Sequence, residues 1–388
     1  MNDASRVWDV VVIGAGPAGA LAATTAAEAG LTTLLIDRSA FPRFKVCGAC
    51  VSWRAVKVLR RHGLDELVTG NVAVSLRHFQ LHAAGYSARV ELPGGVAVAR
   101  ETFDQMLVEA AVSRGASFLP ETVAEVVPGP AVDYRQVRLM PRGSLQPGTL
   151  HSARVVVVAD GLGHPSLKLW PEFACCVEGA KIGLGAVFDD ASHNFESGVI
   201  YMAAARAGYV GIVRLADGRL NVAAALDSSQ IGREGEPVEL MGQILAQAGV
   251  AVPDLRSADW RGTRTLTRRS PRTAAPRLFL VGDAAGYVEP FTGEGIATAL
   301  ESASAVQPLV QQGVVNWDDA LAEQWERLGL TVGIGRQNVC RHLIWWMRFP
   351  WAVRLGLQTL AWCPGLADLL VKRINSTALP SANWGQVA

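Results

Sequence analysis

The sequence predicts an α/β fold in which helices cover a parallel sheet, with a second layer of antiparallel strands beside it. Three short apolar runs at 10–13, 155–158 and 278–281 indicate the parallel sheet, because strands buried on both faces are apolar throughout. Alternating apolar and polar residues with glycine-rich turns over 71–98 and 180–227 indicate the antiparallel layer. The chain is therefore expected to combine two kinds of sheet.

The composition is that of a folded protein without a dominant surface charge. Half of the 388 residues are apolar and 18% are charged, with 36 basic and 35 acidic residues. A chain of this length is long enough for two interwoven domains or one large one, and a net charge of +1 gives no reason to expect a nucleic-acid partner. No apolar run approaches the roughly 20 residues that span a bilayer, and the first apolar stretch lacks the pattern of a secretion signal. We therefore expect a cytoplasmic protein.

The first forty residues predict a strand, a turn, a helix and a second strand. The run at 10–13 leads into a G-x-G-x-x-G turn at 14–19. The Ala-rich stretch 20–29 predicts a helix that ends at a glycine, and 31–36 predicts a strand that ends before Asp37. The other predicted elements are a loop over 41–51, helices over 53–67, 100–114, 237–248 and 295–309, and strands over 117–127 and 132–140.

The turn at 14–19 has the spacing of a phosphate-binding loop. Gly14 permits a tight turn, Gly16 lets the backbone approach a pyrophosphate, and Gly19 allows close packing of the helix on the strand. Free N–H groups at the start of the following helix bind phosphate. Asp37, at the end of the second strand, is placed to accept hydrogen bonds from ribose hydroxyls. The strand, the helix and the carboxylate together predict a dinucleotide site.

Two later strand ends carry a similar signal. The second apolar run is followed by Asp160 in an Ala-Asp-Gly turn, which can approach a cofactor closely but is by itself an ordinary strand exit. The third run is followed by Gly282 and Asp283, whose carboxylate is placed to hold a polyol chain. The Gly-Glu-Gly turn at 293–295 then starts a helix whose positive end stabilises negative charge on a reduced flavin ring.

Together these signals resemble the FAD fold of aromatic hydroxylases (the p-hydroxybenzoate hydroxylase fold), flavin-dependent halogenases and geranylgeranyl reductases, over residues 1 to about 310. The resemblance implies that the three glycines of the first turn hold the pyrophosphate, Asp37 the adenosine ribose and Asp283 the ribityl chain. It also implies that Arg100, which opens a helix, lies beside FAD. The predicted FAD-binding residues are Gly14, Gly16, Pro17, Ala18, Gly19, Asp37, Arg38, Lys45, Cys47, Gly48, Arg100, Asp160, Gly282, Asp283, Gly293, Gly295 and Ile296.

These elements and motifs predict a discontinuous Rossmann-like FAD-binding domain, an antiparallel β-sheet domain for the substrate and a helical C-terminal region. Tryptophans and arginines in the third region fit a peripheral membrane contact or the lid of a lipid tunnel. Pro350 and Pro364 break that region into short pieces, which favours helices packed on the core. The predicted ranges are 1–70, 100–170 and 268–335 for the first domain, 71–99 and 171–267 for the second, and 336–388 for the third.

The loop at 41–50 indicates one branch of this superfamily. It resembles the Pro-x-x-Lys-x-Cys-Gly-Gly loop of geranylgeranyl reductase-like flavoproteins, in which a cysteine lies near the flavin. Pro42, Lys45 and Cys47 stand at the matching positions, and Ala49 replaces the second glycine. The Gly-Glu-Ser and Trp-x-Trp-x-Ile-Pro signatures of halogenases are missing from the sequence, so halogenation ranks low.

The segment at 208–213 is the nearest match to the Tyr-x-Trp-x-Phe-Pro segment that lines the lipid pocket of geranylgeranyl reductases. Tyr209 fits this pattern, whereas Gly211 and Val213 replace its Trp and Phe, and no Pro follows. Losing two large side chains changes the pocket, so the resemblance does not extend to a geranylgeranyl substrate. Tyr209 and Cys47 are the predicted catalytic residues, both expected near the substrate.

Cys47 and Cys50 leave more than one interpretation open. Cys47 matches the family loop and is expected to place the substrate or supply a proton. A dithiol that exchanges electrons with the flavin is an alternative, although such pairs usually open a helix in a different fold. A further interpretation is that Cys50 is simply a small residue packed in the core. A zinc site would need two further ligands, which Cys175 and Cys176 do not supply, so no metal is predicted.

We therefore predict an FAD-dependent oxidoreductase that acts on a hydrophobic organic substrate such as a lipid, an isoprenoid or a polyketide. Reduction of a C=C bond is the first hypothesis. No second complete dinucleotide motif is present in the sequence, so we expect NAD(P)H to bind transiently or a reductase or carrier protein to act as partner. The alternatives are an NAD(P)H- and O2-dependent hydroxylase, a halogenase and a flavin-binding protein without catalytic activity.

Overall fold

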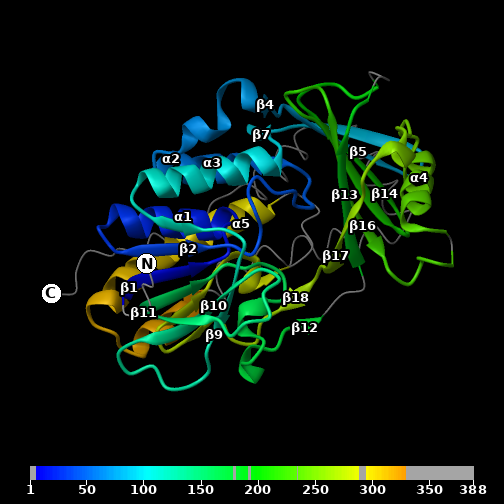
Figure 1. Ribbon diagram of the computed structural model, residues 1–388. Helices are drawn as coiled ribbons and strands as arrows, with labels where there is room; N and C mark the ends of the chain where they lie inside the picture. Colours follow the sequence, from blue (N-terminus) through cyan, green and yellow to red (C-terminus); the bar gives the residue numbers. More distant parts are fainter. Residues whose placement is uncertain (1–5, 178–180, 191–193, 234, 288–293, 329–388) are drawn as a thin grey trace.

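The computed structural model describes residues 6–177, 181–190, 194–233, 235–287 and 294–328. Within them the chain forms two large sheets side by side, with helices packed on each (Figure 1). One sheet is mainly parallel and the other mainly antiparallel. The α/β class predicted from the sequence, with both kinds of sheet, is confirmed.

An eight-stranded sheet is the larger of the two. Its strands are β1 (Val7–Ile13), β2 (Thr33–Ile36), β8 (Ser117–Leu119), β9 (Thr122–Val126), β10 (Arg135–Pro141), β11 (Thr149–Val158), β19 (Ala274–Ala275) and β20 (Leu278–Leu280). Strand β1 lies between β11 and β2 and is parallel to both. The side chains of Val10, Val11 and Val12 are fully buried, as expected for a strand covered on both faces. Strands β2, β1, β11 and β20 therefore end at one common edge of the sheet.

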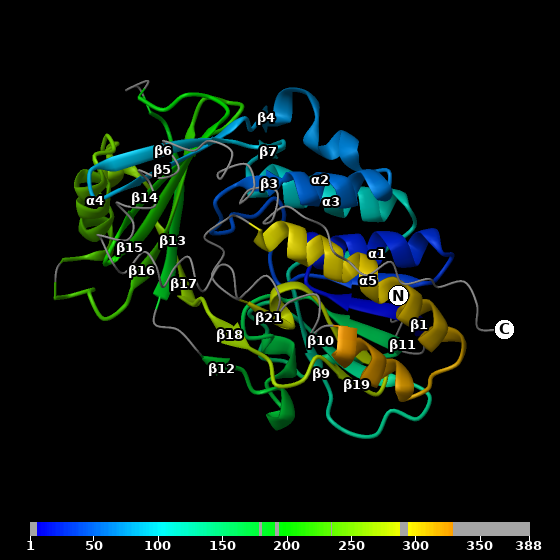
Figure 2. The ribbon, with the colours of Figure 1, turned by 180° about the vertical axis from the view of Figure 1, so that it is seen from behind.

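Helices cover one face of this sheet, as the two opposite views show (Figures 1 and 2). They are α1 (Pro17–Glu28), α3 (Arg100–Ser113) and α5 (Gly295–Val315), with α2 (Trp53–Arg61) packed on α5. Small side chains such as Ala20 and Ala23 in α1 are fully buried, which lets the helix lie close to the strands. The opposite face packs against the β9–β10 hairpin and the aromatic side chains of Trp170 and Phe173.

A seven-stranded sheet forms the second layer. Its strands are β5 (His78–Ala83), β6 (Tyr86–Glu91), β13 (Lys181–Phe188), β14 (Val199–Ala205), β15 (Gly208–Arg214), β16 (Leu220–Asp227) and β17 (Arg261–Thr265). Helix α4 (Pro237–Ala248) covers its outer face, and the inner face is turned toward the eight-stranded sheet (Figure 2). Two small sheets complete the described chain, one of β3 (Cys50–Ser52), β4 (Val74–Ser75) and β7 (Gly95–Ala97), the other of β12 (Cys176–Val177), β18 (Arg268–Arg269) and β21 (Gly286–Tyr287).

Two predicted helix ends differ from the structure. The helix predicted to reach residue 67 ends at Arg61, because Gly63 adopts a left-handed φ of 63° just beyond it, a common way for a helix to end. Helix α5 runs past the predicted end at 309, since it continues through Pro308 to Val315. The helical region predicted for 336–388 lies outside the described residues.

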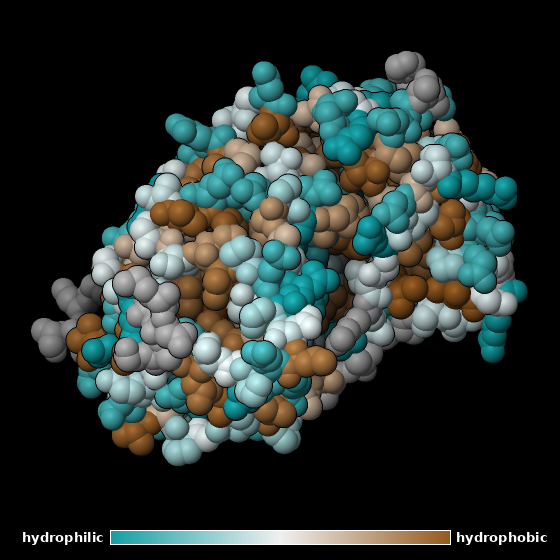
Figure 3. All heavy atoms as spheres, in the orientation of Figure 1, coloured by the Kyte–Doolittle hydropathy of each residue, from teal (hydrophilic) through white to brown (hydrophobic). Residues whose placement is uncertain are grey.

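On the face drawn in Figure 3, polar and apolar side chains are interspersed.

Candidate functional site

A cavity joins the strand ends of the first sheet to the inner face of the second. Its walls come from segments that lie far apart in the sequence. From the first sheet and its helices they include Gly14, Gly16, Pro17, Ala18, Asp37, Arg100, Ala159, Asp160, Gly161, Leu162, Asp283, Gly295, Ile296 and Ala299. From the loop after β2 and the start of β3 they include Arg43, Lys45, Val46, Cys47, Gly48 and Cys50. The second sheet contributes the rest. The structure thus brings most of the predicted site residues together.

The turn after β1 is shaped by two glycines that have no room for a side chain. Gly14 has a φ of 99°, and a Cβ on it would lie 2.4 Å from the carbonyl oxygen of Ala159. A Cβ on Gly19 would lie 1.8 Å from the carbonyl oxygen of Gly14, so Gly19 sets helix packing and does not line the cavity. The backbone at Gly16 faces open space. A Cβ on Gly16 would meet just one atom of the described chain within 4 Å, a guanidinium nitrogen of Arg43 at 3.6 Å.

Asp37 and Arg43 flank this turn. One carboxylate oxygen of Asp37 accepts from the N–H of Ala15 and the other from the N–H of Ser39, both at 2.9 Å. Nη2 of Arg43 lies 3.3 Å from Asp104 and 3.7 Å from Asp37. Its Nε is buried and has no hydrogen-bond partner among the described residues. Arg43 thus brings positive charge to the glycine turn after β1, a role that the sequence motifs did not predict.

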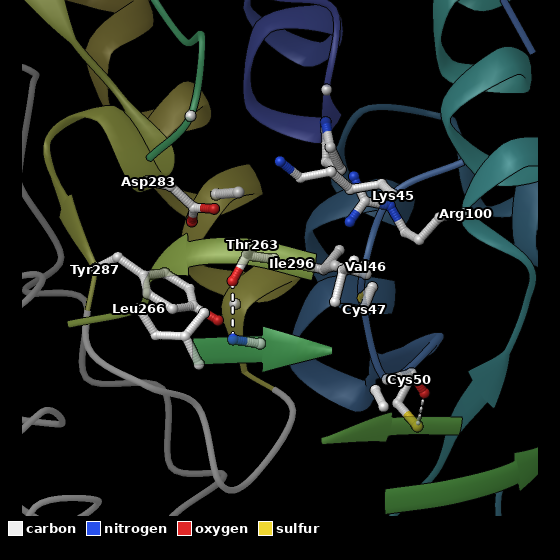
Figure 4. A pocket seen from close by; sticks show the side chains of 18 of the residues that line it. Lys45, Val46, Cys47, Cys50, Arg100, Thr263, Leu266, Asp283, Tyr287 and Ile296 are labelled. Atoms are coloured by element: carbon white, nitrogen blue, oxygen red, sulfur yellow. Dashed lines mark hydrogen bonds between the residues drawn. The ribbon is translucent and has the colours of Figure 1, made fainter. Parts of the chain in front are cut away.

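Lys45 and Asp283 face the same cavity from different segments. In Figure 4, Lys45 lies beside Arg100 on one wall, and Asp283 and Tyr287 lie on the other. Burial lowers the pKa of Lys45, and the nearby Asp283 opposes this shift. Burial likewise raises the pKa of Asp283, opposed by Lys45 and Arg100. Each group therefore loses hydration that its opposite charge replaces only in part.

Arg100 opens α3, as predicted, and is held by its own helix. Its Nε and Nη2 each donate to a carboxylate oxygen of Asp104 at 2.8 Å, one turn further on. Burial acts to lower the pKa of Arg100, but Asp104 raises it above its usual value, with a smaller contribution from the side chain of Cys47. The guanidinium is thus a permanent positive charge in the cavity wall, next to the predicted catalytic thiol.

The two cysteines of the loop have different surroundings. Cys47 is partly exposed, lines the cavity, and its carbonyl accepts from Nδ2 of Asn221 at 2.9 Å. Cys50 is buried in β3 and its thiol donates to the carbonyl of Gly48 at 3.1 Å. Burial raises the pKa of Cys50 well above its usual value, so it stays protonated. The geometry favours Cys50 as a packed residue over a redox dithiol. Ala49 between them has a φ of 55°, where glycine would be unstrained.

The inner face of the seven-stranded sheet forms the apolar end of the cavity. On β15, Tyr209, Gly211 and Val213 alternate toward it, because residues two apart share one face of a strand. A Cβ on Gly211 would make only ordinary contacts, the nearest being 3.4 Å to Cε of Met202. The other lining residues of this end are Phe79, Gly183, Ile200, Met202, Ile212, Ala223, Ala224, Ala225, Thr263, Leu266 and Tyr287.

Several predicted cofactor residues do not line the cavity. The side chain of Arg38 is exposed. Gly282 is buried, and its N–H donates to Oγ of Ser302 at 2.8 Å. Gly293 lies outside the described residues. Asp160 does line the cavity: Oδ2 accepts from the N–H of Ser166 at 2.8 Å, and burial raises its pKa. Oδ1 of Asp160 is buried and has no partner among the described residues.

The sequence motifs missed the residues that only the folded chain brings to the cavity. Arg43 lies within the predicted loop, and its charge was the available signal. Thr263 and Tyr287 belong to short strands and Leu266 to the bend after β17, and none of the three is part of a motif. In the described part of the chain, no group of three or more His, Cys, Asp or Glu side chains is arranged to hold a metal ion. None of the described helices combines the length and apolar character needed to cross a membrane.

The fold and this cavity define a class of flavin-dependent oxidoreductases, and sequence comparison agrees. Residues 7–308 match the family described as FAD binding domain. The chain belongs to this family of FAD-binding enzymes. It is 30% identical to menaquinone reductase of Mycobacterium tuberculosis over 356 residues, 82% of this chain and 81% of that protein. It is also 30% identical to digeranylgeranylglycerophospholipid reductase 2 of Methanopyrus kandleri over 312 residues, 76% of this chain and 74% of that protein.

Solved structures share the fold at lower identity. A triple mutant of the flavin-dependent brominase Bmp2 superposes with a TM-score of 0.73 at 17% identity, over 95% of this chain and 94% of that chain. PqsL of P. aeruginosa superposes with a TM-score of 0.72 at 18% identity, over 91% of this chain and 100% of that chain. These likenesses establish the fold class of the whole described molecule.

The residues present fit FAD. The cradle formed by Gly14 and Gly16 leaves the backbone open where a pyrophosphate needs close approach. Two buried polar atoms at the cavity, Nε of Arg43 and Oδ1 of Asp160, have no partner among the described residues and offer a donor and an acceptor to a polar ligand. The protein is thus an FAD-dependent oxidoreductase.

Proposed function

We propose that the protein reduces a C=C bond of an isoprenoid-like hydrophobic substrate, with electrons that pass through FAD from NAD(P)H or a partner reductase. The observation that carries this proposal is the two-sided cavity. Its charged end contains Gly14, Asp37 and Asp283, and its apolar end is the inner face of the seven-stranded sheet. Names of relatives add support, since two at 30% identity are named reductases of menaquinone and of a digeranylgeranyl lipid.

The charged end is assigned to the dinucleotide. Backbone N–H groups at the start of α1 and the guanidinium of Arg43 would hold the pyrophosphate. Asp37 would accept from the adenosine ribose, and Asp283 from the ribityl chain. Arg100 and Lys45 bring two positive charges to the wall opposite Asp283, and the first turn of α5 at Gly295 would face the redox-active ring.

The apolar end is assigned to the substrate. Apolar side chains such as Ile200, Met202 and Leu266 line this end. They form no hydrogen bonds with water, so an apolar substrate can displace water from this end without loss of such bonds. The absence of a side chain at Gly211, where an added Cβ would make only ordinary contacts, leaves the cavity wall low at this point. This favours an extended or planar apolar group lying against the sheet over a compact polar metabolite.

Bound FAD supplies hydride transfer to a substrate carbon. The chain positions that carbon against the ring and donates the accompanying proton to the neighbouring carbon. Two groups in the cavity wall carry a transferable proton, the thiol of Cys47 on the loop after β2 and the phenol of Tyr209 on β15. The Arg100 guanidinium beside Cys47 would stabilise the thiolate left after proton donation.

The experiment is an absorbance spectrum of the purified protein followed by anaerobic turnover with NADPH and a prenylated quinone or isoprenoid lipid, with dithionite used only to reduce the flavin in the absence of substrate. We expect a flavin spectrum, bleaching on reduction, and a product that stays heavier by two hydrogen atoms after any quinol ring has been reoxidised in air. Cys47→Ser and Tyr209→Phe should lower turnover, whereas Cys175→Ser, at a cysteine outside the cavity, should not. A colourless protein that FAD does not reconstitute contradicts the assignment. Product that forms only with O2 and contains an added oxygen identifies a hydroxylase instead.

A further inference from the structure

A fully buried arginine lies behind the cavity wall, outside the motifs that predicted the site. The side chain of Arg54 is 1% exposed. Its Nε donates to Oε1 of Glu301 at 3.1 Å, and its Nη2 donates to Oε2 of the same carboxylate. Its Nη1 donates to Oε2 of Glu294 at 2.6 Å. One guanidinium therefore holds two carboxylates from another part of the chain.

The two carboxylates belong to the start of one helix. Glu294 is the residue before the first turn of α5, and Glu301 lies two turns further along. This spacing puts both on one side of the helix, the side that contacts α2. Gly295, Ile296 and Ala299, between them in sequence, line the cavity. Arg54 thus binds α5 at both ends of the segment that lines the cavity.

Arg54 also connects α5 to the cysteine loop. It lies in the first turn of α2, which follows β3 directly, and β3 follows the loop that contains Cys47. Oγ of Ser52, at the end of β3, donates to Glu294 at 3.4 Å. The segment that follows the cysteine loop is therefore joined to the start of α5 mainly through the side chain of Arg54.

A buried ion pair of this kind is poor evidence for stability alone. Removing three ionised groups from water carries a large desolvation penalty, and well-packed apolar residues in their place are often as stable or more so. A planar guanidinium with several fixed donors is, in contrast, well suited to hold two groups in a set geometry. The arrangement is explained better by positioning than by stabilisation of the fold.

We propose that Arg54 is a positioning residue that holds the first turn of α5 against the flavin and thereby raises the flavin reduction potential. The proposal rests on the function proposed above. The free N–H groups of a helix N-terminus stabilise negative charge within about one turn, so the effect on a reduced flavin depends on where that turn sits. If the turn moves away, the reduced state loses stabilisation and the potential becomes more negative.

The test compares Arg54→Lys with Arg60→Lys, an exposed arginine on the same helix that pairs with Asp65. Lysine keeps the charge at position 54 but cannot donate to both carboxylates in the same geometry. We expect Arg54→Lys to shift the midpoint potential of bound FAD to more negative values and to raise the FAD dissociation constant about ten-fold. Arg60→Lys should match the wild type in both measurements. Equal potentials in the two variants would overturn the proposal.

A double variant separates positioning from folding. Arg54→Met with Glu301→Leu replaces buried charge by apolar side chains, and should bring the melting temperature of the FAD-free protein back toward that of the wild type. Because Arg54 then no longer donates to Glu294, the potential and the FAD affinity should stay shifted. Recovery of all three would show a purely structural role and overturn the proposal. If the wild-type protein binds no FAD, the proposed function is wrong. This outcome is seen before any variant is made, so it is distinct from a failure of the Arg54 proposal.

Discussion

Gly14 shows how much a single backbone position determines at this site. Its φ of 99° and the 2.4 Å gap from a would-be Cβ to the Ala159 carbonyl mean that only glycine lets β1 turn into α1 while β11 ends beside it. Gly19 and Gly282 serve the same close packing, since a Cβ on Gly282 would lie 2.9 Å from that of Ala18. The glycines of the motif therefore have two roles. Gly14 and Gly16 line the cavity, and Gly14 and Gly19 allow the neighbouring strands and helix to pack closely.

We predict that Gly14→Ala costs much more stability than Gly30→Ala. Gly30 has a similar φ of 78° but nothing within 4 Å of a Cβ, so alanine there introduces backbone strain alone, about 1 kcal/mol. At Gly14 the clash with Ala159 adds to the strain, for a total of about 2–5 kcal/mol. Urea unfolding of the FAD-free variants measures both costs. Equal losses would show that β11 gives way without penalty and that the close approach is not needed.

At the scale of elements, the contact between α2 and α5 includes a partly buried histidine in addition to the ion pairs of Arg54. His62 follows the end of α2, and its Nε2 lies 2.8 Å from Oγ of Ser304 on α5. Burial, and then the neighbouring Arg61, lowers the pKa of His62 below its usual 6.5. The folded protein thus keeps this ring neutral at pH values where the unfolded chain protonates it.

The contact should therefore weaken in acid. Below the pKa of an unfolded histidine, the unfolded chain binds more protons than the folded one, so stability falls as the pH drops. His62→Gln is neutral at every pH and should lose less stability than the wild type between about pH 7.5 and pH 5. Ser304→Ala should lower stability overall but keep the wild-type pH dependence, because burial of the ring remains. Melting curves measured across this pH range test the prediction. If stability falls equally with pH in the wild type and in His62→Gln, His62 is not the group responsible.

At the scale of the whole molecule, the cavity depends on how two sheets face each other. Asn221 on β16 donates to the carbonyl of Cys47 and so ties the seven-stranded sheet to the cysteine loop. Gly211 lies on the same inner face and leaves space at the apolar end. We therefore expect side chains of the seven-stranded sheet to limit the size of a substrate and the cysteine loop to orient it.

We predict that Gly211→Leu selectively impairs large apolar substrates. A side chain of this size fills the space beside Met202, and discrimination of this kind amounts to roughly ten-fold or more in kcat/KM. The FAD dissociation constant should be unchanged, because the dinucleotide end lies on the other sheet. Gly211→Ala adds one methyl group at ordinary contact distance and serves as the matched control. Loss of FAD from Gly211→Leu would show that the two ends of the cavity are not separate.

The sequence predicted the dinucleotide end of the site better than the substrate end. Gly14, Asp37 and Asp283 each follow a buried strand, and the ends of parallel strands meet at one edge, so local patterns were sufficient to bring them together. Arg54 and Glu301 are far apart in the sequence and pair only in the folded chain. Tyr287 likewise follows no periodic pattern. Such contacts depend on how helices and sheets pack, which hydrophobic periodicity does not specify.

The walls of the cavity are drawn from Gly14 near one end of the described chain to Ala299 near the other. A growing polypeptide on the ribosome completes β1 and α1 early, but the central sheet lacks β20 and the Asp283 corner until nearly all of these residues have been made. A nascent chain interrupted before this point has nothing to close over the prosthetic group. We therefore expect that flavin is bound only after the Asp283 corner and the first turns of α5 have been synthesised.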